Sequence, residues 1–104
     1  MKWFRDIFNQ QISLVAETEV HIVEEHHEML GQIDKIRTTL LYPETIIRSS
    51  SDTRSIIYYR YFDTTPVTSK YLCVVVKILI NERFISTAYF RPTIQKGVTL
   101  WTKK

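Results

Sequence analysis

The sequence predicts an α+β domain in which N-terminal helices pack on one face of a four- to five-stranded antiparallel sheet. Three observations lead to this fold class. Apolar residues recur with helical spacing through residues 17–42, strand-like runs fill residues 45–101, and short connections between those runs favour antiparallel pairing. The 104 residues are enough for one domain, 1–104, and too few for two.

The first segment, residues 1–15, is expected to form a hairpin. Its stretch FRDIFNQQISLV has two apolar runs on either side of Asn9 and Gln10. Asparagine favours turns because it tolerates left-handed backbone conformations and its short side chain can bond to the neighbouring main chain. We therefore expect two short antiparallel strands before the first helix.

The helical part, residues 17–42, carries one apolar stripe. A helix is expected to start near Glu17, because acidic side chains are favoured in a first turn. The stripe recurs every three or four residues and consists of Ile22, His26, Met29, Ile33, Ile36 and Leu40. Gly31 interrupts it, so one kinked helix and two short helices both fit the pattern. Pro43 ends the helical region.

Residues 45–101 are expected to form the antiparallel sheet. The run YLCVVVKILI (71–80) is apolar on both faces, which is typical of a central strand. Other strands are expected at residues 45–49, 56–62 and 84–90, which are rich in β-branched and aromatic side chains. A fifth strand, 98–101, would lie at an edge of the sheet.

Side chains alternate along a strand, so the run 71–80 presents two different faces. One is wholly apolar and is expected to meet the helices: Leu72, Val74, Val76, Ile78 and Ile80. Lys77 is the only charged residue of the run and lies on the other face. Its ammonium group either extends into water from an apolar surface or binds an anion. In the next strand we expect Thr87 and Tyr89 beside Lys77, and four residues against the helices: Phe84, Ser86, Ala88 and Phe90.

Charge is unevenly distributed along the chain. Residues 1–52 hold five basic and nine acidic residues, whereas residues 53–104 hold nine basic and two acidic ones. The second half is therefore expected to build a basic surface, either for an anionic partner or to pair with the acidic helices. No apolar run is long enough to span a membrane. The single cysteine, Cys73, allows no internal disulfide, and we expect a reduced thiol and a cytoplasmic protein.

The histidines lie in the segment HIVEEHHEM. His26 falls on the apolar stripe, where it is either a hydrogen-bonded core residue or an acid–base group at the helix–sheet edge. His21 and His26 point in different directions around a helix, so no metal site is expected. The nearby glutamates most simply form a charged helix face.

Several stretches together resemble the phage-type branch of the barnase–EndoU–colicin–RelE-like (BECR) nucleases. They are HIVEEHHEM, LLYPETI, YYRYF, YLCVVVKILI, and FISTAYF followed by KGVTLW. The similarity extends from about Ile12 to Trp101, and the motifs occur in the family's order. It implies helices on a four-stranded antiparallel sheet, and metal-independent RNA cleavage by attack of the 2′-hydroxyl, with no cofactor. It also implies a cognate inhibitor or immunity protein.

The resemblance further implies which residues act. The family's motifs match His21, His26, Arg60, Lys77, Thr87 and Tyr89, and all of these except His21 are the expected catalytic residues. The expected substrate-binding residues are His21 and, outside the matched positions, His27, Tyr59, Tyr61 and Arg54. His27 stands where the family has proline, so either His26 or His27 is expected to be the acid–base group. The alternative function is a non-catalytic RNA- or protein-binding module, an inactive relative with the same fold.

Overall fold

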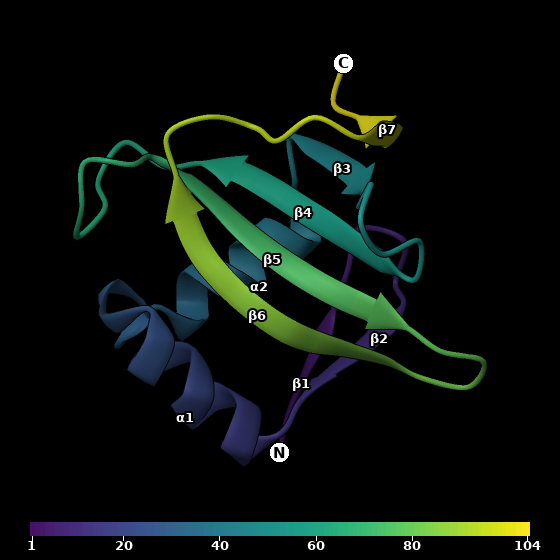
Figure 1. Ribbon diagram of the computed structural model, residues 1–104, viewed down its shortest axis with the longest axis horizontal. Coiled ribbons are helices and arrows are strands. Elements are labelled where there is room, and N and C mark those ends of the chain that lie inside the picture. The colour runs from purple at the N-terminus through teal and green to yellow at the C-terminus, as the bar shows by residue number, and fades with distance from the viewer.

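Seven strands, two α-helices and one 3-10 turn make up the computed structural model, which describes residues 1–104 (Figure 1). In chain order they are β1 (Lys2–Arg5), β2 (Gln11–Leu14), α1 (Ala16–Glu25), the 3-10 turn η1 (His27–Met29), α2 (Ile33–Leu41), β3 (Thr45–Arg48), β4 (Ser55–Tyr61), β5 (Tyr71–Ile78), β6 (Arg83–Arg91) and β7 (Val98–Thr102).

All seven strands belong to one mixed sheet with the order β1-β2-β6-β5-β4-β3-β7. The expected four- to five-stranded antiparallel sheet is therefore wrong. The N-terminal hairpin joins the sheet, and β2 pairs with β6 in parallel through Ser13 and Phe84. Short connections force antiparallel pairing only between the strands they join. The connection from β2 to β6 contains both helices and three strands, so the rule left this pairing undetermined.

The sheet curls strongly around α2. In Figure 1, α2 lies behind β4 and β5, and α1 lies beside β6. The two edge strands, β1 and β7, approach each other on the helix side of the sheet. Phe8 of the β1–β2 turn packs edge-to-face on Trp101 of β7, with ring centroids 6.4 Å apart. The Ile7 N–H also donates to the Leu40 carbonyl at the end of α2 (3.0 Å). Helix α2 is thus enclosed on several sides by strands.

The main core lies between the sheet and the helices. From β5 it includes Leu72, Val74 and Val76, which are fully buried. Ile80, expected on the same face, is instead 98% exposed because β5 ends at Ile78 and the following residues form the tip of the β5–β6 hairpin. Removing the apolar strand and helix faces from water is the principal force that holds the layers together.

Helix α1 ends at Glu25, and His26 has a non-helical backbone (φ −134°, ψ 83°). Gly31 follows η1 with φ +76°, a left-handed conformation that glycine adopts without a steric penalty. The chain then enters α2 after Gln32. Of the two arrangements that the apolar stripe allowed, the structure has two short helices, and the break brings His26 to the end of α1.

A buried aspartate anchors the N-terminal hairpin. Asp6 is 2% exposed, and its Oδ1 accepts from the N–H groups of Phe8 (3.0 Å) and Gln10 (2.8 Å). Its Oδ2 accepts from the hydroxyl of Tyr58 on β4 (2.6 Å). Burial, and next this bond to Asp6, hold the pKa of Tyr58 far above its usual value. The hairpin is therefore fixed to the centre of the sheet by a satisfied polar contact.

Candidate functional site

The outer face of the sheet, which faces away from α2, is divided into a covered part and an open part. Under the segment after β6, Ile94 packs against a second, small cluster that comprises Ile47, Ile57, Tyr59 and Cys73. Next to this cover lies the open face, which we define as Val75, Lys77, Phe84, Thr87 and Tyr89 of β5 and β6, all of them half-buried. Val75 and Tyr89 form its border with the small cluster, against which they also pack.

Strand register aligns a row of side chains across the outer face. The Cα pairs Trp3–Ser13, Ser13–Phe84, Phe84–Lys77 and Lys77–Ser55 are direct neighbours on successive strands. Paired residues point to the same side of a sheet, and adjacent strands are about 4.8 Å apart. Two aromatic side chains, a lysine and two hydroxyls therefore follow one another across five strands.

A β-bulge explains why Phe84 is on this face. Val75 pairs with Thr87, but Val76 pairs with Ile85, so Ser86 is an extra residue in β6. Its hydroxyl donates to the Val75 carbonyl (3.3 Å). An extra residue reverses the alternation beyond it. The expectation that Phe84 faces the helices together with Ala88 and Phe90 is therefore wrong, and Ile85 is the buried residue there.

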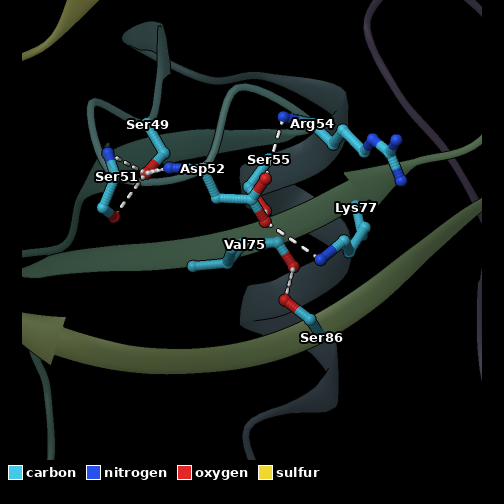
Figure 2. Close-up of polar contacts among 8 residues, drawn as sticks. All are labelled: Ser49, Ser51, Asp52, Arg54, Ser55, Val75, Lys77 and Ser86. Atoms are coloured by element: carbon cyan, nitrogen blue, oxygen red, sulfur yellow. Dashed lines mark hydrogen bonds and ion pairs between the residues drawn. The ribbon is translucent and has the colours of Figure 1, made fainter.

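Lys77 points outward and is held by an ion pair. Its Nζ lies 3.0 Å from Oδ2 of Asp52 in the β3–β4 loop, and the two side chains are 36% and 38% exposed. Figure 2 shows the other donors to this carboxylate, the Ser55 hydroxyl (2.9 Å) and the Arg54 backbone N–H (3.0 Å). The Lys77 ammonium, followed by these two groups, lowers the pKa of Asp52 to about 2. Lys77 thus binds an anion that the chain itself supplies.

His26 reaches the open face from the edge of the sheet. Its ring stacks on Tyr89, with centroids 5.2 Å apart and an interplanar angle of 27°. The His26 N–H donates to the Ile22 carbonyl (2.7 Å), which fixes the end of α1 beside β6. His27, one residue on, is exposed in η1. His21 is exposed on α1, where its Nε2 lies 3.0 Å from Oε1 of Glu25.

Arg60 lies on the opposite side of the sheet from Lys77. It pairs with Leu72, whose side chain is in the main core. Its guanidinium donates to the Tyr42 carbonyl (2.6 Å) and lies over the ring of Phe62, 5.7 Å from the centroid. This cation caps the end of α2, a favourable place for positive charge. The expected meeting of Arg60 with Lys77 around one phosphate does not occur.

The other expected substrate-binding residues are scattered. Tyr59 is fully buried beneath the covering segment, where its hydroxyl accepts from the Gln95 N–H (3.3 Å), and burial raises its pKa to about 12. Tyr61 is 43% exposed and packs edge-to-face on Tyr71. Arg54 lines a shallow groove at the β5–β6 hairpin tip. Tyr61 lies on the outer face in the row of Tyr71, beyond the covered part, and none of the three belongs to the open face around Lys77.

His26, Lys77, Thr87 and Tyr89 do share one surface, but it is extended. Tyr89 pairs with Cys73, which is four residues from Lys77 along β5. At about 3.3 Å per residue, the backbones at the two ends are about 13 Å apart. That separation suits a strand of several nucleotides better than the two sides of one phosphate.

Sequence reasoning missed Trp3, Phe84, Asp52 and Ser55. Neighbouring residues of a strand face opposite sides, so placing Phe4 in the core would have predicted that Trp3 faces outward. No local signal in the sequence indicated that Phe84 faces outward, because the bulge depends on the partner strand.

Cys73 is a buried thiol whose pKa is raised to about 12 by burial, which disfavours the reactive thiolate. No group of three or more histidine, cysteine, aspartate or glutamate side chains lies close enough to hold a metal ion.

No protein-family model, curated protein or solved structure matches this chain. The resemblance to BECR nucleases therefore stays a prediction from short motifs. No helix has the length and apolar character needed to cross a membrane.

Proposed function

We propose that this protein binds single-stranded RNA on the open face of its sheet. The observation that carries the proposal is the arrangement of Phe84 and Tyr89 on the same surface as Lys77, with Trp3 continuing the row. Unpaired bases stack on aromatic rings, and lysine neutralises the phosphates between them. The surface is a sheet face rather than a deep cleft, which suits an extended strand.

Hydroxyl groups and charge add to this chemistry. Thr87 lies on the outer face, where its hydroxyl can pair with the 2′-hydroxyl that distinguishes RNA from DNA. Arg91 pairs with Tyr71 at the far end of the same face. The excess of basic residues in the second half of the chain favours a polyanionic partner. Such binding weakens steeply as salt concentration rises.

The proposal is tested by fluorescence anisotropy with a labelled ten-nucleotide single-stranded RNA. We expect Phe84→Ala to weaken binding by about tenfold, because a base stacked on an aromatic ring contributes about 1–3 kcal/mol. Tyr42→Ala is the matched control, since Tyr42 is an exposed aromatic residue (63%) at the end of α2, away from this face. Equal affinities for the two variants would contradict the proposal.

A second candidate function is metal-independent RNA cleavage, as the BECR resemblance implies. The observation that favours it is the stack of His26 on Tyr89, which brings an imidazole to the surface that carries Thr87 and Lys77. The imidazole would take the proton of a 2′-hydroxyl while the 2′-oxygen attacks phosphorus. The bond between phosphorus and the 5′-oxygen would break, and a water molecule would supply the proton to the leaving 5′-oxygen. The product would be a 2′,3′-cyclic phosphate, and DNA would resist.

Incubation of RNA with the pure protein in EDTA tests this candidate. Cleavage is expected to fall at least about 100-fold in His26→Ala, with His27→Ala as the control one residue away. If the wild-type protein leaves the RNA intact, RNA binding without cleavage remains as the proposed function.

A cleaving protein would require a cognate inhibitor or immunity protein in its own cell. For either function we propose a cytoplasmic location, where a lone thiol such as Cys73 stays reduced.

A further inference from the structure

The carboxylate of Asp52 occupies what is, chemically, an anion-binding site. Three donors from two strands and a loop converge on it: Lys77 Nζ and Ser55 Oγ on Oδ2, and the Arg54 N–H on Oδ1. Figure 2 shows this carboxylate lying over β5 next to Lys77, while the Arg54 side chain extends away from it. Ammonium, hydroxyl and backbone N–H groups are the donors that also bind phosphate oxygens.

We infer that this site is a phosphate subsite of the RNA-binding surface, which Asp52 fills in the free protein and vacates when RNA binds. The inference rests on the proposed RNA-binding function. Asp52 is then an internal competitor that lowers the affinity of the free protein for RNA. A phosphate would take the contacts with Lys77 and Ser55 that the carboxylate now makes.

The position of the site beside an aromatic ring supports this assignment. Lys77 is the Cα partner of both Ser55 and Phe84, so the anion site and the ring lie on adjacent strands in one row. Adjacent strands are about 4.8 Å apart. A nucleotide whose base stacks on Phe84 therefore brings its own or the neighbouring phosphate to Lys77.

The loop can release the carboxylate without opening the sheet. The Ser49 N–H donates to the Ser55 carbonyl (3.0 Å) and the Ser55 N–H to the Asp52 carbonyl (2.9 Å), so the main chain closes the β3–β4 turn by itself. The Asp52 and Lys77 side chains are both more than one-third exposed. Exposed ion pairs contribute little to stability, so an external anion can replace the carboxylate.

Asp52→Asn removes the charge and keeps the shape. The amide oxygen can still accept from the Arg54 N–H, and the amide NH2 can donate to the Ser55 hydroxyl, but no charged oxygen is left to pair with Lys77. Asp63→Asn is the matched control, because Asp63 is an exposed aspartate in the β4–β5 loop and the change in net charge is the same. We expect Asp52→Asn to bind the ten-nucleotide RNA about tenfold more tightly than Asp63→Asn, and Lys77→Met to abolish this gain.

Inorganic phosphate provides a readout that does not depend on RNA. In an NMR titration, the Ser55 and Lys77 amide signals of Asp52→Asn should shift at about tenfold lower phosphate concentration than those of Asp63→Asn. Equal phosphate affinities would overturn the inference, whether or not RNA binds. A phosphate difference with no RNA binding by either variant would overturn the RNA-binding function and support a masked anion site. Equal RNA affinities of the two variants, with RNA bound, would show that Asp52 does not compete with RNA.

In the wild-type protein the same idea is tested without substitution. Saturation with RNA should raise the pKa of the Asp52 carboxyl from about 2 toward the ordinary value of 3.8, because Lys77 and Ser55 then bind phosphate. An unchanged pKa in the complex would mean that Asp52 stays in place and would overturn the inference.

Discussion

Asp6 and Asp52 make closely similar contacts in very different surroundings. Each uses Oδ1 to accept from the backbone of its own turn and Oδ2 to accept from a side chain on a central strand. Asp6 is 2% exposed and meets Tyr58, whereas the Asp52 side chain is 38% exposed and meets Lys77. The same side-chain chemistry therefore fixes the fold at one place and forms a solvent-exposed ion pair at the other.

Burial makes this difference. When one partner of a buried hydrogen bond is removed, no water can take its place. The remaining polar group is left buried without a partner, and the free energy of unfolding falls by its full desolvation cost. At an exposed ion pair, water or another anion can take the vacated place. The Asp6 contact is expected to govern stability, and the Asp52 contact is expected to govern what binds to the open face.

The largest effect is expected for Asp6→Ala. It leaves the Tyr58 hydroxyl and two turn N–H groups without their acceptor, so the free energy of unfolding should fall by about 3 kcal/mol. Urea denaturation at neutral pH measures this, with Asp63→Ala as the exposed control. A loss as small as that of the control would remove the distinction between the two aspartates.

Tyr58→Phe sharpens the comparison from the other partner. It removes only the hydroxyl that donates to Asp6 and keeps the ring in the main core. We expect the free energy of unfolding to fall by about 2 kcal/mol, the range for hydrogen bonds to charged groups. The same change at an exposed tyrosine, Tyr42→Phe, should leave the urea midpoint unaltered. Similar midpoints for both variants would argue against a buried anchor.

Lys77→Met tests the exposed contact through acid titration. The folded pKa of Asp52 is about 2, below its unfolded value of 3.8, so the ionised carboxylate stabilises the fold above that value. This contribution is lost as the pH falls from 3.8 to 2. Without the ammonium, the largest cause of the shift, the pKa measured by carbonyl NMR should rise toward 3.8. A pKa that stays near 2 would mean that Arg54 N–H and Ser55 suffice.

The smallest effect on stability is expected for Asp52→Asn. The loop keeps its main-chain hydrogen bonds, and the ion pair that is lost is exposed and contributes little, so the urea midpoint at neutral pH should lie only slightly below that of Asp63→Asn. A clearly lower midpoint would assign Asp52 a structural role like that of Asp6, and would weaken the argument for an exchangeable site.

Local patterns in the sequence predicted much of the secondary structure, but they did not determine the sheet. The turn at Asn9, which has φ +62°, and the outward direction of Lys77 follow from residue type and alternation. The parallel pairing of β2 with β6 depends on where the helices return the chain, which no local pattern contains. The sequence therefore predicted too few strands in the sheet, because nothing local assigned the two hairpin strands to it.

The candidate site was predicted only in part, for the same reason. Thr87 and Tyr89 lie on the same face as Lys77, as alternation predicted, but neither is its direct neighbour: the bulge at Ser86 turned Phe84 outward into that place. Arg60 had apolar neighbours on either face, so its place depended on the pairing of β4 with β5. Asp52 lies in a polar loop whose contact with Lys77 appears only when the β3–β4 turn reaches β5.

The central claim, that the open face binds single-stranded RNA, is tested most directly by NMR. The ten-nucleotide RNA should shift the amide signals of Lys77, Phe84, Thr87 and Tyr89 in the wild-type protein. Arg60, on the helix side, should be unaffected. Shifts confined to the helix side, or no shifts at low salt, would contradict the account.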